Sequence, residues 1–236
     1  RKSDTMRDGF VKVASATPKI KVADPQFNAQ AIIDMIDMAA KEKVKVLTFP
    51  ELCITGYTCG DLFLQKLLED KALEALEKIA GATMGKDMLV AVGLPVRVDC
   101  RLYNCAAVLW EGELLALVPK VNIPNYSEFY EKRYFASGAD VDFSEVSLPG
   151  FGQVSFGTDV IFKNQVLPEL AVGLEICEDL WVPNPPSVGL AMAGATVILN
   201  LSASDETVAK GDYRRELVSG QSARLVCGYI YADAGS

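Results

Sequence analysis

Eight near-continuous apolar runs recur along the chain, and runs of this kind are typical of buried β-strands. Segments with helical spacing of apolar residues lie between several of them. The strand-like runs cover residues 10–17, 44–50, 88–96, 104–110, 113–120, 170–177, 196–204 and 227–234. The helical segments cover residues 26–42, 61–80, 186–194 and 212–226. This alternation predicts a layered α/β fold, in which helices cover the faces of sheets.

The first two helical segments have the clearest amphipathic patterns. Residues 26–42 place four apolar side chains on one stripe, and the segment follows an Asp-Pro start at 24–25, a common way to begin a helix. Those four residues are Ile32, Ile33, Ile36 and Ala40. Residues 61–80 repeat the pattern with Leu64, Leu67, Leu68, Leu73, Leu76 and Ile79. Each segment is therefore predicted to be a helix with one buried face.

One connection departs from the strand–helix–strand order. Glu111-Gly112 separates two strand-like runs in "VLWEGELLALV", which is a hairpin signal. The sheet is therefore expected to be mixed. No linker rich in Pro, Gly or Ser divides the sequence, and no internal repeat is visible, so we expect residues 1–236 to form one domain.

Composition narrows the possible partners and surroundings of the protein. Half of its 236 residues are hydrophobic, which argues against disorder, and the net charge of −8 argues against nucleic acid or an anionic membrane as a partner. No apolar run reaches the roughly 18–20 residues of a membrane span. The six cysteines form no Cys-x-x-Cys pair, so we expect buried thiols in a reducing, cytoplasmic environment and no metal site.

The chain contains no histidine. This excludes Ser-His-Asp and Cys-His catalysis, and zinc bound through histidine, within these residues. A general base would have to be Glu, Asp, Lys, Tyr or Cys.

Three apolar runs end on a chemically reactive side chain. "VKVLTFPE" ends on Glu51, "LLALVPK" on Lys120 and "LAVGLEIC" on Cys177. If these ends lie on one edge of the sheet, Glu51 could take the thiol proton and Lys120 could stabilise the resulting negative charge. The alternative for each residue is structural: a solvated strand end for the charged pair, and a buried thiol for the cysteine.

The same three segments resemble the signature segments of the carbon–nitrogen hydrolase (nitrilase) superfamily. They are "FPELCITGY" (49–57), "LVPKVNIPNYSEFYEKRYF" (117–135) and "VGLEICEDLW" (172–181), in the expected order. The resemblance implies an α/β fold of the nitrilase type, an α-β-β-α sandwich with mixed sheets. It also implies a Glu-Lys-Cys triad made of Glu51, Lys120 and Cys177.

A finer resemblance is to the glutaminase domain of glutamine-dependent NAD⁺ synthetases. "CITGYTCGDLF", "EICEDLWVPNPP" and "NLSASDETVAKGDYRRELV" carry it. It implies hydrolysis of L-glutamine through a cysteine thioester, with no cofactor for that step. The ammonia would serve a fused synthetase domain that uses ATP and Mg²⁺ to amidate deamido-NAD⁺.

The resemblance has consequences for the whole protein as well. It implies a domain truncated at its C-terminus, an absent synthetase domain and a homo-oligomer. One alternative is a free-standing amidase of the same superfamily acting on another small amide or nitrile, and another is a catalytically silent scaffold.

The resemblance also assigns supporting roles. Glu131 is expected to position the lysine or the substrate amide, with Glu128 as its rival, and the backbone N–H of Glu178 is expected to bind an oxyanion. Positions that would line the glutamine pocket are Tyr57, Tyr126, Trp181, Ser204 and Lys210. Lys210 stands where an arginine is common. Structural alternatives remain, since aromatic residues of 126–135 could pack the loop and Ser204 could cap a helix.

The carboxylates around Cys177 raise a separate question about its ionisation. Alternation along a strand would place Glu175 on the same side as Cys177, where its negative charge would disfavour the thiolate.

Overall fold

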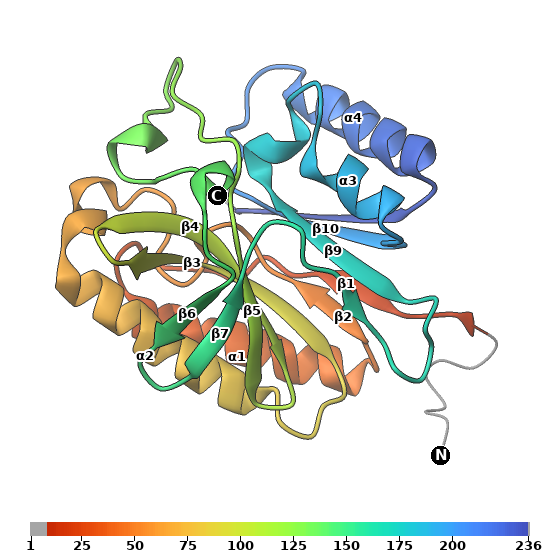
Figure 1. Ribbon diagram of the computed structural model, residues 1–236, viewed down its shortest axis with the longest axis horizontal. Helices are drawn as coiled ribbons and strands as arrows, with labels where there is room; N and C mark the ends of the chain where they lie inside the picture. Colours follow the sequence, from red (N-terminus) through yellow and green to blue (C-terminus); the bar gives the residue numbers. More distant parts are fainter. Residues whose placement is uncertain (1–8, 236) are drawn as a thin grey trace.

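The computed structural model describes residues 9–235, and two sheets form its centre (Figure 1). The first sheet has seven strands in the order β1-β2-β3-β4-β5-β7-β6. They are β1 (Val13–Ser15), β2 (Val46–Thr48), β3 (Leu89–Val98), β4 (Arg101–Trp110), β5 (Glu113–Pro119), β6 (Glu145–Leu148) and β7 (Gly152–Phe156). Strands β1, β2 and β3 are parallel, whereas β3, β4 and β5 are antiparallel, so the sheet is mixed as predicted.

The second sheet has four strands in the order β11-β10-β9-β8. They are β8 (Phe162–Lys163), β9 (Ala171–Ile176), β10 (Val197–Ser202) and β11 (Gly228–Asp233). Strands β9, β10 and β11 are parallel, and the register places Asn200 of β10 beside Glu175 of β9. Apolar side chains from both sheets, including Val108 and Leu174, form a core between them.

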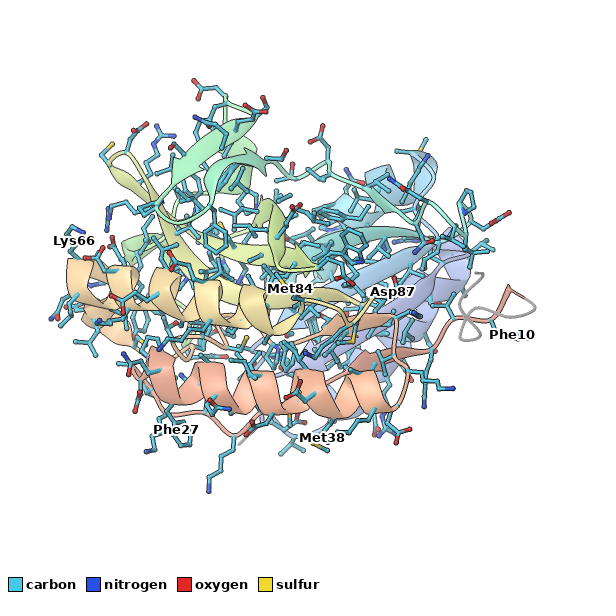
Figure 2. All side chains as sticks on the ribbon, turned by 90° about the horizontal axis from the view of Figure 1, so that it is seen from below. Phe10, Phe27, Met38, Lys66, Met84 and Asp87 are labelled. Carbon is cyan, nitrogen blue, oxygen red and sulfur yellow. The ribbon has the colours of Figure 1, made fainter. Side chains whose placement is uncertain are left out.

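Two pairs of helices cover the outer faces of the sheets. Helices α1 (Pro25–Lys41) and α2 (Lys66–Ala82) lie side by side below the first sheet, with Met38 on the solvent side of α1 (Figures 1 and 2). Helices α3 (Pro186–Met192) and α4 (Lys210–Leu225) lie on the second sheet. Short 3₁₀ helices that bear on the site are η2 (Gly60–Leu64), η3 (Glu131–Arg133), η4 (Gly138–Asp140) and η5 (Cys177–Leu180). This arrangement is the α-β-β-α sandwich with mixed sheets that the sequence predicts.

Each of the eight apolar runs overlaps a strand, although β3 and β4 extend beyond their predicted bounds, and Glu111-Gly112 forms the turn between β4 and β5. The strands β6, β7 and β8 were not expected. In β6 and β7 exposed and buried residues alternate, so these strands contain no continuous apolar run. The helix predicted over 61–80 is also divided, because Gln65 takes an extended conformation between η2 and α2.

The Asp-Pro start of the first helix is confirmed, since the Asp24 carboxylate accepts a hydrogen bond from Phe27 N at 3.1 Å. We expect Asp24→Ala to lower the free energy of unfolding by about 1 kcal/mol, because it removes an N-cap. Urea denaturation measures this. Asp34→Ala on the exposed face of α1 is the control and should change it by less than about 0.5 kcal/mol. Equal effects of both substitutions would contradict the capping role.

Within residues 9–235, no helix has the length and apolar character needed to cross a membrane.

Candidate active site

Glu51 lies in a turn directly after β2 and is 2% exposed. The turn packs against β3 at Gly93, where an added Cβ would lie 2.3 Å from Leu52 N. Only glycine leaves room for this close approach of two backbones. The glycine therefore allows the end of β2 to hold a charged residue inside the molecule.

Lys120 follows β5 and is fully buried between two carboxylates. Its Nζ lies 2.7 Å from Glu51 Oε1, and 2.9 and 3.0 Å from the two oxygens of Glu131 in η3. Burial alone would lower the pKa of Lys120, but the negative charges around it, Glu51 first, raise that pKa well above its usual value. The ammonium is therefore charged and holds the two carboxylates together.

Further hydrogen bonds fix these carboxylates. Glu51 accepts from Asn104 Nδ2 at 2.7 Å and from Ala203 N at 3.0 Å, while Glu131 accepts from the Tyr57 hydroxyl at 2.7 Å. Burial and then the charge of Glu51 raise the pKa of Glu131 to about 7, although Lys120 opposes this shift. It is thus Glu131 that contacts Lys120, while Glu128 lies on the wall of the neighbouring cavity.

Cys177 lies at the end of β9, in the second sheet, and begins η5. Its φ of 45° is left-handed and rare for a residue with a side chain. Its N–H donates to Asn200 Oδ1 at 3.0 Å, and its Sγ accepts from Ser202 Oγ at 3.4 Å. Burial, followed by the charge of Glu51, raises the pKa of the thiol, with Lys120 acting in the opposite direction. The resting thiol is therefore protonated, and its reaction requires a base.

The three reactive strand ends meet, but not along the edge of one sheet. Glu51 and Lys120 come from the first sheet, whereas Cys177 comes from the second. They meet at the end of β10, where its last residue, Ser202, contacts the thiol and the next residue, Ala203, contacts Glu51.

The alternation argument for Glu175 does not extend to Cys177, because β9 ends at Ile176 and Cys177 is left-handed. The Glu175 carboxylate instead accepts hydrogen bonds from Ser187 N at 2.8 Å and from the Tyr229 hydroxyl. The negative charge that raises the pKa of the thiol is that of Glu51.

The turn that carries Cys177 is tied to the segment after Lys120. Asp179 in η5 accepts from Ile176 N at 3.0 Å and from Asn122 N at 2.7 Å. The Glu178 carboxylate accepts from the Tyr126 hydroxyl at 2.9 Å. The positions of Lys120 and Cys177 are therefore coupled.

A cavity of about 530 Å³ lies beside this group and is walled largely by aromatic side chains. Of the predicted pocket residues, Tyr57 and Ser204 line it. Trp181 packs on Tyr213 with ring centroids 5.6 Å apart, and the Lys210 ammonium lies 5.2 Å from the Trp181 ring. Tyr126 is half exposed, on the rim of a second hollow lined by residues 121–126.

Arg214 is not predicted as a site residue from the sequence, although it lies beside the cavity wall. The Lys210 ammonium is already paired with Asp205. Arg214 Nη2 donates to Asp205 O at 3.0 Å, while its buried Nε has no hydrogen-bond partner among the residues that the structure describes. Arg214 is also paired, because its Nη1 lies 3.0 Å from Glu206 Oε2 and 3.3 Å from Asp233 Oδ2. Its planar guanidinium nevertheless suits a carboxylate ligand better than the Lys210 ammonium does.

Asn104, Asn200 and Ser202 were also missed. Each is a polar residue within a predicted apolar strand, and each is buried. A polar side chain in a buried strand needs a partner, and this rule could have marked them as site residues.

Across residues 9–235, no group of three or more Cys, Asp or Glu side chains is placed to hold a metal ion.

Comparison with known proteins agrees with this geometry. The model of the carbon–nitrogen hydrolase family matches residues 12–231. The chain belongs to this family. A glutamine-dependent NAD⁺ synthetase of Mycobacterium tuberculosis is 40% identical over 227 residues, which are 96% of this chain and 33% of that protein. The chain thus spans about a third of the length of the curated relatives it matches.

Solved structures of the family show the same fold. The crystal structure of a glutamine-dependent NAD⁺ synthetase from Cytophaga hutchinsonii matches with a TM-score of 0.82 and 32% identity, over 95% of this chain and 36% of that one. An amidase from Nesterenkonia sp. matches with a TM-score of 0.73 over 99% of this chain and 80% of its own, but at 20% identity it supports the fold alone.

Proposed function

We propose that this chain is the glutaminase part of a glutamine-dependent NAD⁺ synthetase. It hydrolyses the side-chain amide of L-glutamine and releases ammonia for the ATP-dependent amidation of deamido-NAD⁺. The observation that carries the proposal is the buried contact of Lys120 with Glu51 beside the Cys177 thiol. The likeness to synthetases over nearly the whole chain favours glutamine over other amides.

The proposed reaction passes through a thioester. Glu51 takes the proton of Cys177 as the sulfur attacks the amide carbon, and Lys120 with the N–H of Glu178 stabilises the oxyanion. The protonated Glu51 then gives its proton to the leaving ammonia. Water, activated by Glu51, attacks the thioester and releases glutamate with the free thiol. Glu131 holds Lys120 in place, and Tyr57 holds Glu131.

The remaining parts of the proposal concern the whole protein. Residues 1–236 are one hydrolase domain, whose fused synthetase domain uses ATP and Mg²⁺, while the hydrolysis itself needs no cofactor. The protein is a cytoplasmic homo-oligomer.

A substrate panel tests the proposed activity. Glutamine should be hydrolysed with a kcat/KM at least about 100-fold above those for asparagine, simple amides and nitriles, because the cavity of about 530 Å³ lined by Tyr57 and Ser204 leaves room to bind the whole amino acid. A preference for a nitrile or a simple amide would instead support a free-standing amidase, and no hydrolysis at all would support a scaffold.

We expect Arg214→Ala to raise the KM for glutamine by about 10–100-fold with a smaller change in kcat, because it removes a cationic donor beside the pocket. Lys210→Ala is the matched comparison and should raise the KM less, since an ammonium offers no planar pair of donors to a carboxylate. Steady-state kinetics measure both. A larger effect of Lys210→Ala would return the role of carboxylate binding to the lysine.

A further inference from the structure

A line of hydrogen bonds connects the nucleophile to a buried carboxylate that takes no part in the proposed reaction. The Cys177 N–H donates to Asn200 Oδ1 at 3.0 Å, and Asn200 Nδ2 donates to the Tyr229 hydroxyl oxygen at 3.0 Å. Tyr229 in turn donates to Glu175 Oε1. Glu175 is 1% exposed, and its other oxygen accepts from Ser187 N at the start of α3. We call these four groups the Glu175 relay.

The relay has a defined direction. Both oxygens of Glu175 accept a hydrogen bond, as those of an ionised carboxylate do. Because Tyr229 gives its only proton to Glu175, its oxygen must accept from the Asn200 amide. Asn200 therefore presents its NH₂ to Tyr229 and its carbonyl oxygen to Cys177. The charge of Glu175 thus determines which end of the Asn200 amide faces the nucleophile.

We propose that Glu175 is a positioning residue for Cys177, acting through Tyr229 and Asn200. The proposal rests on the thiol hydrolysis proposed above. The cysteine is left-handed, a strained conformation for a residue with a side chain, and its N–H bond to Asn200 helps to hold it. A shift of this turn moves the sulfur away from the amide carbon, and small displacements of a nucleophile slow reactions strongly.

Loss of the negative charge disrupts the relay. A proton on the lone pair that faces Tyr229 leaves the Tyr229 proton without an acceptor, or makes the Asn200 amide turn over. After that turn, an NH₂ group would face the Cys177 N–H, donor against donor. A proton on the lone pair that faces Ser187 N opposes that donor in the same way. A proton elsewhere on the carboxyl group makes it a neutral and therefore weaker acceptor, so each outcome costs or weakens a buried hydrogen bond.

The surroundings of Glu175 place this charge change near neutral pH. Burial raises the pKa of Glu175 to about 7, against the hydrogen bonds from Tyr229 and Ser187. The titratable groups that face it are Tyr229 of β11 and Asp179 of η5. Strand β10 and helix α3 contain no titratable side chain. Helix α4 approaches through Gln221, which donates to Ser187 Oγ at 2.9 Å and accepts from Arg224.

A double-mutant cycle, made in the full-length protein, tests the relay. We expect Glu175→Gln and Tyr229→Phe each to lower the kcat for glutamine about tenfold, with KM within twofold. The double variant should be no more than twofold slower than Tyr229→Phe alone, because one broken relay cannot be broken twice. Glu69→Gln, which removes a carboxylate charge bound to Arg97, and Tyr103→Phe in the core are the matched controls and should keep kcat. A double variant about 100-fold slower, or unchanged single variants, would overturn the proposal.

A pH series separates positioning from a merely structural role. The ratio of wild-type to Glu175→Gln kcat should be about ten at pH 8 and fall toward one at pH 6, because the protonated wild type then lacks the same hydrogen bond as the variant. Groups that titrate equally in the wild type and the variant, such as Glu131, affect both kcat values alike and cancel in this ratio. If Glu175→Gln does not fold, the ratio of the wild-type kcat to the Tyr229→Phe kcat gives the same test. A ratio that stays constant with pH contradicts the relay.

The outcomes also separate this inference from the proposed function. Glutamine hydrolysis that depends on Cys177 but not on Glu175 overturns the relay alone. If the wild type does not hydrolyse glutamine, the proposed function fails, and the rate of Cys177 alkylation by iodoacetamide tests the relay with the same variants and ratios.

Discussion

Cys177→Ala should lower the rate of glutamine hydrolysis on the order of 10⁴-fold or more, because no other group can form the thioester. Glutamate release measures this loss. In the protein that carries the synthetase domain, ammonia-dependent formation of NAD⁺ should persist. The fold should survive, since the change removes one buried sulfur atom. Cys105→Ala removes another buried thiol, from a strand in the core, and is expected to keep hydrolysis. Retained hydrolysis in Cys177→Ala would contradict the assignment of the nucleophile.

Labelling gives an independent check on the same residue. A glutamine-like diazo-ketone amino acid should add once to the wild type, and the adduct should map to Cys177 among the six cysteines. The thiol is protonated at rest, so the reaction should depend on Glu51 and fall sharply in Glu51→Gln. Absence of the adduct in folded protein would favour a scaffold.

The sequence predicts the strands that carry the site because those strands are buried on both faces. Continuous apolar runs mark β2, β5 and β9, and the first charged or reactive residue after each run is conspicuous. The strands β6 and β7, at one end of the first sheet, have only one buried face, so their signal is a short alternation that a search for apolar runs does not find. The pattern of burial, more than strand propensity, decides what can be predicted.

The meeting of the reactive residues is harder to predict. Glu51 and Cys177 belong to different sheets, and only the packing of one sheet on the other brings Ser202 and Ala203 between them. The left-handed conformation of Cys177 is likewise hidden, because no glycine, asparagine or proline stands at or beside this position in the sequence. The spacing of residues along the sequence reveals neither the packing of the two sheets nor the conformation of Cys177. The resemblance to a known family supplied what the residues alone left open.

Lys120→Met should be the most damaging substitution for the fold as well as for the reaction. Its ammonium is the shared partner of Glu51 and Glu131, and all three side chains are buried. Removing it leaves two carboxylates facing each other without a cation, which should lower the free energy of unfolding by about 3–5 kcal/mol. Hydrolysis should fall by about 10³-fold or more. Urea denaturation and glutamate release measure the two effects.

The comparison with Glu51→Gln separates the two roles of this cluster. That variant loses the base, and hydrolysis with it, but keeps the contact of Lys120 with Glu131, so its loss of stability should be smaller. Lys66→Met removes an exposed ion pair with Asp70 and should change stability by less than about 1 kcal/mol. Equal stability of Lys120→Met and Lys66→Met would show that the buried cation does not hold the carboxylates.

The loss in Lys120→Met should also depend on pH in a known direction. Lys120 lowers the pKa of Glu131, so its removal raises that pKa further above the value of about 7 in the wild type. The folded variant then binds a proton that the unfolded chain, with an ordinary glutamate, releases above a pH of about 4.5. Its stability is therefore greatest below that pH and is lost as the pH rises through the raised pKa. Denaturation at pH 5 and pH 8 measures the difference, which should be larger than in the wild type; a deficit that grows toward pH 5 would contradict the assigned charges.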